Sequence, residues 1–106
     1  MARFRPSTIF VADYRQVTTA TATIATRDRV IGVNFAGGVT LTLPRASQVR
    51  GRFIVNDESG LASGNNITMV PVTGSGETID GSSSNVIDSN FGSRGYYSNG
   101  SNWFTI

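Results

Sequence analysis

The side chains of this sequence that could do chemistry are few, and the most conspicuous are carboxylates set among turn-forming residues. They are Asp57, Glu58, Glu77 and Asp80. Such oxygens can ligate Ca²⁺ from loops, but the sequence has no EF-hand spacing and no repeated Asp motif, so we predict no metal site. Glu58 and Glu77 are the only glutamates that a glycoside hydrolase could pair. We expect Asp57 and Asp80 to hold turns instead, by accepting hydrogen bonds from nearby backbone N–H groups.

The sequence lacks the groups that usually activate a nucleophile. It contains no His, no Cys and no Lys, so its many serines have no general base of the common kinds. The G-x-S-x-G elbow does not occur, and the Gly-Ser-Gly at residues 74–76 lacks the third glycine of a dinucleotide fingerprint. We therefore predict a protein that is not an enzyme, with no catalytic residues and no cofactor.

The basic residues are all Arg, and they are unevenly distributed. Eight of the nine lie in residues 1–52, whereas five of the seven acidic residues lie in residues 53–106. The planar, five-donor guanidinium suits protein interfaces. This segregation predicts either that the basic part of one subunit contacts the acidic part of its neighbour or that a basic end docks on an acidic partner. The alternative is that these charges are simply solvated. The residues assigned to contact with a partner or a neighbouring subunit are Arg3, Phe4, Arg5, Arg15, Arg27 and Arg29.

Binding to nucleic acid or to a membrane is a weaker interpretation of the same residues. Arginines interleaved with Phe4, Phe10 and Tyr14 could contact phosphates and stack on bases. However, the net charge is only +2 and no nucleic-acid-binding motif accompanies the arginines, so we expect no nucleic-acid partner. The longest apolar runs are only a few residues, which predicts no membrane-spanning helix and no membrane partner.

Aromatic residues gather near the end of the sequence and allow two interpretations. Tyr96 and Tyr97, together with Asn99, could bind a glycan by stacking on and hydrogen bonding to its sugar rings. Alternatively, the alternation of the last segment places Trp103 in the core, with Tyr96 or Tyr97 packed beside it. We expect Trp103 to be a core residue.

The composition and the alternation of apolar residues predict an all-β protein. Gly, Ser, Thr and Asn dominate, and most of them favour turns or strands over helix interiors. We expect a basic N-terminal arm over residues 1–15, with a short strand at 7–11, and one β-domain over residues 16–106. This domain should be a compact sandwich or barrel of about eight or nine short strands. The expected strands of the domain are 16–25, 30–35, 39–43, 52–56, 67–70, 78–79, 85–87, 96–97 and 103–106.

Three local expectations follow from the patterns. Residues 16–25, with small apolar residues opposite threonines, predict one strand that packs well only against a close neighbour. Residues 30–35 and 39–43 are joined by a Gly-Gly segment and predict a hairpin. Residues 45–50 predict a helical turn closed by Gly51. The expected inward face of the hairpin comprises Ile31, Val33, Phe35, Val39, Leu41 and Leu43.

Six short motifs occur in a distinctive order, namely VTLTLP, GRFIV, SG, NNIT, TIDG and GSNWF. In this order the chain resembles small β-domains of tailed-bacteriophage structural proteins, which occur in head-decoration proteins, tail fibres and spikes. The resemblance covers about residues 29–106. Its motifs are structural, and the module recurs in proteins with different roles.

The resemblance implies a bacteriophage virion structural protein that forms a homotrimer and is assembled in the host cytoplasm. We expect a trimeric capsid decoration (cement) protein that binds and stabilises the assembled shell. Its partner would be the major capsid protein or another virion protein, and the arm around Arg3, Phe4 and Arg5 would help to anchor it. The alternative is a tail-fibre or spike tip that binds a host surface glycan or receptor through Tyr96, Tyr97 and Asn99.

Overall fold

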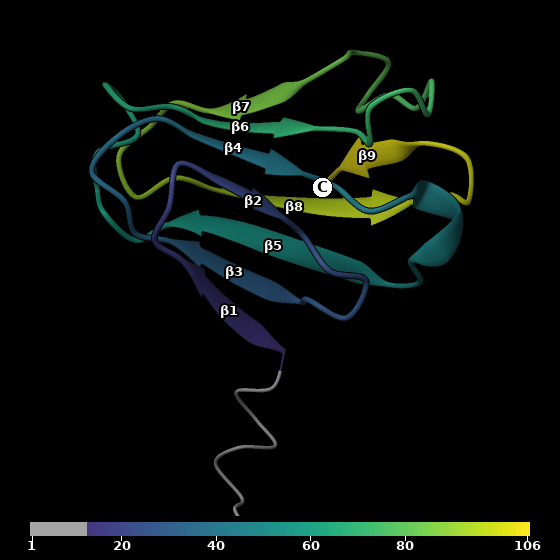
Figure 1. Cartoon of the computed structure of the whole chain (residues 1–106), viewed down its shortest axis with the longest axis horizontal. Coiled ribbons are helices and arrows are strands. Elements are labelled where there is room, and N and C mark those ends of the chain that lie inside the picture. The colour runs from purple at the N-terminus through teal and green to yellow at the C-terminus, as the bar shows by residue number, and fades with distance from the viewer. Residues whose placement is uncertain (1–12) are drawn as a thin grey trace, which may run out of the picture.

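Two β-sheets packed face to face make up the protein in a computed structural model that describes residues 13–106 (Figure 1). The five-stranded sheet has the order β1-β3-β5-β8-β9, and the four-stranded sheet has the order β2-β4-β6-β7. The strands are β1 (Tyr14–Val17), β2 (Thr21–Thr23), β3 (Val30–Val33), β4 (Val39–Thr42), β5 (Arg52–Asp57), β6 (Ile67–Val70), β7 (Asn85–Ile87), β8 (Ser93–Ser98) and β9 (Trp103–Thr105). The prediction of a nearly all-β domain of short strands is confirmed.

The first six strands wind as a coil of three rungs. Each rung gives one strand to each sheet, and successive rungs pair in parallel, as β1-β3-β5 on one side and β2-β4-β6 on the other. The last three strands then add antiparallel partners: β7 beside β6, β8 beside β5, and β9 beside β8. Both sheets are therefore mixed, with the parallel strands contributed by the coil.

The hairpin expected between residues 30–35 and 39–43 does not form. β3 and β4 lie in different sheets, and each pairs with a strand of the next rung. The alternation identified the buried side chains correctly, because Ile31, Val33 and Leu41 are all buried. These strands face one another across the core instead of lying side by side, and alternation alone cannot distinguish the two arrangements. Phe35, predicted as an inward residue, is only half-buried.

The single strand expected over residues 16–25 is also wrong. The chain turns at residues 18–20, so that β1 belongs to one sheet and β2 to the other. Val17 and Ile24 are both buried, although seven positions apart they would point to opposite faces of one continuous strand. The turn lets both side chains reach the core.

An aromatic cluster joins the C-terminal strands to the coil. Phe53 stacks on Tyr96 with ring centroids 5.3 Å apart and meets Trp103 edge to face at 5.5 Å. All three side chains are buried, and the indole Nε1 of Trp103 donates a hydrogen bond of 3.2 Å to the carbonyl oxygen of Pro44. The prediction that Trp103 is a core residue is confirmed.

The two ends of the strand stack differ. Within residues 13–106, the first-rung strands β1 and β2 each have a strand neighbour on one side only. At the other end, Ile79 pairs with Trp103 and with Ser82, which covers the edge of β9. Asp80 and Gly81 have φ angles of 51° and 82°, as a two-residue type I′ turn requires, so these two residues form a tight turn. The stack thus has an open end at the first rung and a capped end at β9.

Regular structure outside the strands is limited to one short segment. The helical turn expected at residues 45–50 forms as a 3₁₀-helix over Ala46–Gln48, and Gly51 follows with a φ of 90°. The strand expected at 78–79 is reduced to isolated bridges made by Ile79. Within residues 13–106, no helix has the length and apolar character needed to cross a bilayer.

Candidate interaction surfaces

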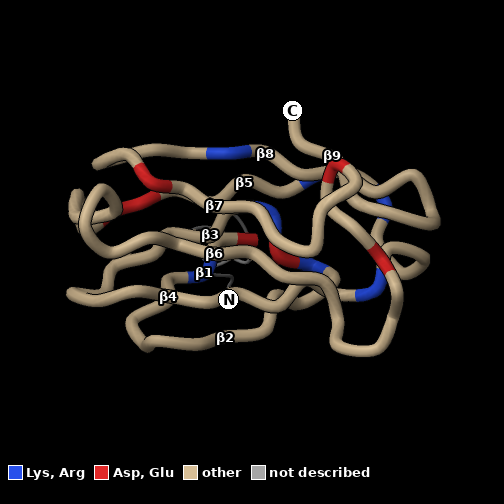
Figure 2. Tube along the Cα trace, turned by 90° about the horizontal axis from the view of Figure 1, so that it is seen from above, with Lys and Arg blue, Asp and Glu red and all other residues tan. Residues whose placement is uncertain are grey.

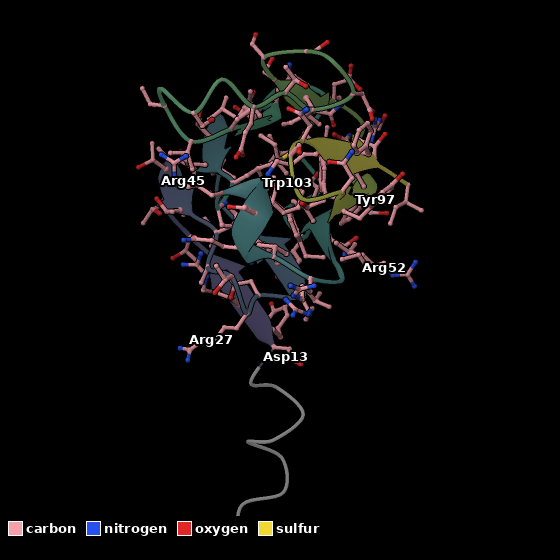
Figure 3. All side chains as sticks on the ribbon, turned by 90° about the vertical axis from the view of Figure 1, so that its right-hand side faces the viewer. Asp13, Arg27, Arg45, Arg52, Tyr97 and Trp103 are labelled. Carbon is pink, nitrogen blue, oxygen red and sulfur yellow. The ribbon has the colours of Figure 1, made fainter. Side chains whose placement is uncertain are left out.

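Arginines gather at one end of the strands, and we call this surface the basic end. The strands β1, β3 and β5 begin there, while β2, β4 and β6 finish there (Figure 1). Figure 2 shows that most Arg positions lie toward this end, whereas acidic positions occur at both ends of the strands. The arginines of the basic end are Arg27, Arg29, Arg45, Arg50 and Arg52, of which all but Arg29 are exposed. Figure 3 looks onto this end and shows the side chains of Arg27, Arg45 and Arg52 pointing outward in different directions.

Two of the arginines that the sequence assigned to partner contact hold the structure together. The Nε of Arg15 lies 3.2 Å from the Oδ2 of Asp28, whose carboxylate also accepts a hydrogen bond of 2.8 Å from the backbone N–H of Ala25. Arg29 donates to the backbone carbonyls of Thr26 and Asp28. These bonds close the loop between β2 and β3, and Arg27 is presented at its exposed tip.

The expected arm is only partly described. Arg3, Phe4 and Arg5 and the strand expected at 7–11 lie outside the described residues, as does most of the range 1–15. Tyr14 and Arg15, which fall within that range, belong to β1. The chain therefore enters the first rung directly after Asp13, at the open end of the coil.

At the end of the strands opposite the basic end, a buried carboxylate organises the loops. Asp57, at the end of β5, is 3% exposed and accepts hydrogen bonds from the hydroxyl of Ser59. It also accepts bonds from the backbone N–H groups of Gly60, Ala62 and Phe91, at 3.2, 3.0 and 3.0 Å. Burial opposes ionisation, but these hydrogen bonds outweigh it and hold the pKa of the Asp57 carboxyl below its usual value. The expectation that Asp57 holds a turn is confirmed.

Asp80 has a comparable role at the capped end. Its carboxylate accepts hydrogen bonds from both the hydroxyl and the backbone N–H of Thr105, and these bonds lower the pKa of Asp80. Asp80 thus ties the 79–82 turn to β9. The expected partners were nearby backbone N–H groups, whereas Thr105 is distant in the sequence. Glu77 accepts two bonds from the backbone N–H of Ala46 at the start of the 3₁₀-helix. Residues 13–106 contain no cluster of three potential metal-ligating side chains.

Glu58 forms an anchor that sequence reasoning missed. Its side chain lies across the outer face of the five-stranded sheet and accepts hydrogen bonds from the Tyr14 hydroxyl at 2.7 Å and the Gln16 amide at 2.9 Å. A Cβ at Gly32 would overlap this carboxylate, so only glycine leaves room for it. The Glu58 hydrogen bond also raises the pKa of the Tyr14 phenol. The one signal in the sequence was the glycine inside an otherwise apolar strand.

Tyr96 must be removed from the proposed glycan site. Its ring is fully buried against Phe53, its hydroxyl donates a 2.8 Å hydrogen bond to Asn85, and burial raises its pKa. Tyr97 is exposed and stacks on Phe104 with centroids 5.6 Å apart. Figure 3 shows Tyr97 on the same side of the molecule as Arg52, whereas Trp103 lies between the sheets.

Asn99 lies in the exposed turn between β8 and β9. Its side-chain oxygen accepts hydrogen bonds from the backbone N–H groups of Ser101 and Asn102. It also lines an open hollow of about 360 Å³ together with Arg50 and Ser98. Of the three residues assigned to glycan binding, Tyr97 and Asn99 are therefore on the surface.

Comparison of the sequence with models of known protein families and with curated proteins gives no match.

Proposed function

We propose that this protein is a non-enzymatic structural protein of a tailed-bacteriophage virion, a homotrimer that decorates the assembled capsid and stabilises the shell. The proposal rests on the motif order between Val39 and Ile106. It is supported by a domain whose regular structure is almost entirely strand, and whose described carboxylates include several that hold loops in place. A protein that binds only the assembled lattice stabilises it by mass action.

The point at which the chain enters the domain further supports this assignment. Asp13 precedes β1 at the open end of the coil, so the arm carrying Arg3, Phe4 and Arg5 joins there. In a trimer whose axis runs from the open end to the capped end, three arms would leave from one pole. This pole would face the shell, and the arginines of the arms would meet acidic groups of the capsid protein.

The test is co-sedimentation of the purified protein with undecorated capsids. The proposal predicts saturable binding that raises the temperature at which the capsids break. The variant Arg3→Gln/Arg5→Gln should bind at least tenfold more weakly, since two charged contacts worth about 0.7 kcal/mol or more each give that loss. The variant Thr73→Glu/Ser83→Glu changes the net charge equally at exposed loop positions and should bind like the wild type. Absence of the wild-type protein from the capsid pellet would refute the proposal.

A second candidate function is binding of a host surface glycan by a tail-fibre or spike tip. The specific observation in its favour is the exposed, stacked pair of Tyr97 and Phe104, with Asn99 and an open hollow in the adjoining turn. Aromatic rings of this kind provide flat apolar area together with a polar hydroxyl. Retention on a glycan array that is lost in Tyr97→Ala and kept in Thr40→Ala would favour this function over capsid decoration.

A further inference from the structure

The exposed apolar side chains of this protein are concentrated on one surface. Among the described residues, seven large hydrophobic side chains are exposed, and five of them lie on the outer face of the five-stranded sheet. These five are Tyr14, Val30, Ile54, Tyr97 and Ile106. Scattered apolar residues are ordinary on a protein surface, but a contiguous set marks a contact site. We call this surface the apolar face.

The register of the strands aligns most of these residues in one row. Tyr14 pairs with Val30, Val30 with Ile54, and Ile54 with Gly95, while the backbone N–H of Ile106 bonds to the carbonyl of Gly95. The row crosses all five strands from the open end to the capped end. Alongside it, Arg52 pairs with Tyr97 and Tyr97 with Phe104, which widens the apolar area toward the basic end.

A shallow hollow interrupts the row where glycine replaces a side chain. It has a volume of about 220 Å³ and is bordered by Arg52, Ile54, Gly95 and Ile106. A Cβ at Gly95 would contact the Ile106 side chain at 3.4 Å, so Ile106 leans over the glycine without filling the space. Its lining combines the aliphatic side chains of Ile54 and Ile106 with the polar side chains of Arg52, Ser93 and Arg94, a mixture typical of the rim of an interface.

Opposite charges lie at the two ends of this face. Arg52 stands at the start of β5, toward the basic end, and is exposed. Glu58 stands just after β5, and its carboxylate is held over Gly32 by Tyr14 and Gln16. A carboxylate has about four lone-pair positions, and these two hydrogen bonds leave room for an Arg from outside. The face therefore carries a fixed acceptor at one end and an exposed guanidinium at the other.

We infer that the apolar face is covered by further copies of this chain, with the threefold axis of the trimer running along the Tyr14, Val30, Ile54 and Ile106 row. The inference rests on the homotrimer of the proposed function and adds where the axis lies. Around such an axis, the same row residue from three subunits meets in successive layers. Ile54, on the central strand, forms the middle layer.

The charge arrangement favours this cyclic contact over a random one. In a closed ring, different parts of the same surface meet, so the start of β5 in one subunit lies near the end of β5 in the next. Arg52 then faces the Glu58 side of its neighbour.

The size of the face sets the expected strength of the contact. Five strands about 4.8 Å apart and three ranks of side chains about 7 Å apart give a face of roughly 24 by 20 Å. This area of about 500 Å² is smaller than the roughly 800 Å² that one partner contributes to a standard interface. We therefore expect the trimer to form at tens of micromolar and to dissociate on dilution.

The four-stranded sheet provides a matched control surface. Its outer face presents Thr21 and Thr23 on β2, Thr40 and Thr42 on β4, and Thr68 on β6, with the half-buried Val70 and Val86 beside them. Thr40 lies on a strand with neighbours on both sides, as Ile54 does, and both side chains are exposed. Introducing a charge at position 54 and at position 40 therefore compares the effect of the same change on the two outer faces of one domain.

The experiment measures the molar mass by light scattering over a dilution series, with thermal unfolding to verify that each variant is folded. The wild type should be a trimer at the highest concentrations, Ile54→Arg should be monomeric at every concentration, and Thr40→Arg should match the wild type. A wild-type monomer or dimer would overturn the inference, as would a trimer that survives Ile54→Arg or is lost in Thr40→Arg. The milder Ile54→Ser should shift the midpoint of dissociation by at least tenfold, which keeps the test valid if Ile54→Arg fails to fold.

Capsid binding separates this inference from the function on which it rests. If the wild type is a trimer that Ile54→Arg disrupts but fails to co-sediment with capsids, the axis stands and the decoration role fails. If the wild type binds capsids yet is monomeric in solution at every concentration, the decoration role stands and the axis is overturned.

Discussion

The two outer faces of this domain differ sharply, although the same coil builds both. On the four-stranded sheet, the outward positions of β2 and β4 are all threonine, namely Thr21, Thr23, Thr40 and Thr42. On the five-stranded sheet, the outward row is apolar and runs through Val30 and Ile54. The inward positions of both sheets are apolar alike, since they share one core. The shared core therefore does not require this contrast between the outer faces. We attribute it to a difference in what each face contacts.

Threonine suits a strand whose outer face meets water. Its β-branched side chain favours extended backbone as Val and Ile do, while its hydroxyl can bond to solvent. The chain thus has a way to build an exposed strand without apolar side chains, and it uses this on only one sheet. In an isolated subunit, threonine at positions 30 and 54 would favour the strand as Val30 and Ile54 do. This is why we place a subunit contact on the apolar face.

The largest expected effect comes from breaking the loop that carries Glu58 onto the apolar face. Asp57→Ala leaves the backbone N–H groups of Gly60, Ala62 and Phe91 without their acceptor. Buried donors without a partner cost about 1–3 kcal/mol each, and relaxation of the loop limits the total, so we expect a loss of about 3 kcal/mol in the free energy of unfolding. Urea denaturation measures this loss. A change below about 1 kcal/mol would show that the loop does not depend on Asp57.

The same carboxylate makes stability depend on acidity. Because the pKa of Asp57 is lower in the folded protein than the value of about 3.9 in an unfolded chain, its contribution is complete above pH 4. The contribution is lost as the pH falls below 4 and through the folded pKa. In Asp57→Asn, the free energy of unfolding should therefore fall less steeply between pH 4 and pH 2 than in the wild type. Equal slopes would contradict the lowered pKa.

A side chain at position 32 should damage the apolar face without touching the core. Gly32→Val would displace the Glu58 carboxylate from Tyr14 and Gln16. Because this carboxylate ends an exposed, flexible side chain, we expect a cost of about 1 kcal/mol in unfolding free energy. Thr40→Val is the matched change on the other face and should alter stability by less than about 0.5 kcal/mol. Thermal unfolding of both variants at one low concentration makes the comparison. Equal losses would remove the distinction between the faces.

The smallest expected effect is a change in the titration of Tyr14. Its pKa is raised because its hydroxyl bonds to Glu58, so Glu58→Gln should bring that pKa back toward 10. NMR of the tyrosine rings follows the titration, with Tyr14→Phe to assign the signal. In the wild type, the stabilisation from this bond is complete below pH 10 and is lost as the pH rises through the folded pKa. An unchanged Tyr14 pKa in Glu58→Gln would show that Glu58 is not its partner in solution.

Burial was more predictable from the sequence than pairing. The alternation in residues 30–43 identified Ile31 and Leu41 as buried, because a strand with one wet face must alternate. It could not say that these strands lie in opposite sheets, since a Gly-Gly segment can serve a hairpin or a crossing between sheets equally well. Parallel partners in the coil come from separate rungs, and no local pattern specifies such distant pairing.

The positions of the candidate surface residues could not be predicted from the sequence where they depend on the pairing of distant strands. Alternation required one of Tyr96 and Tyr97 to point inward, but the choice depends on register: Ser98 pairs with Trp103, so Tyr96 shares the buried face of Trp103. Arg15 was assigned to a partner, whereas the fold brings it to Asp28. The Glu58 anchor depends on strands β1 and β3 passing beside the end of β5, which the sequence does not specify locally.

The most direct test of the apolar face as the subunit contact uses a single cysteine, since the chain has none of its own. Ile54→Cys places a thiol in the proposed central layer, where thiols of neighbouring subunits come within reach of a short thiol-specific cross-linker. Thr40→Cys places one on the threonine face. The account predicts covalent dimers from Ile54→Cys at tens of micromolar and none from Thr40→Cys. Cross-linking at position 40, or its absence at position 54, would contradict it.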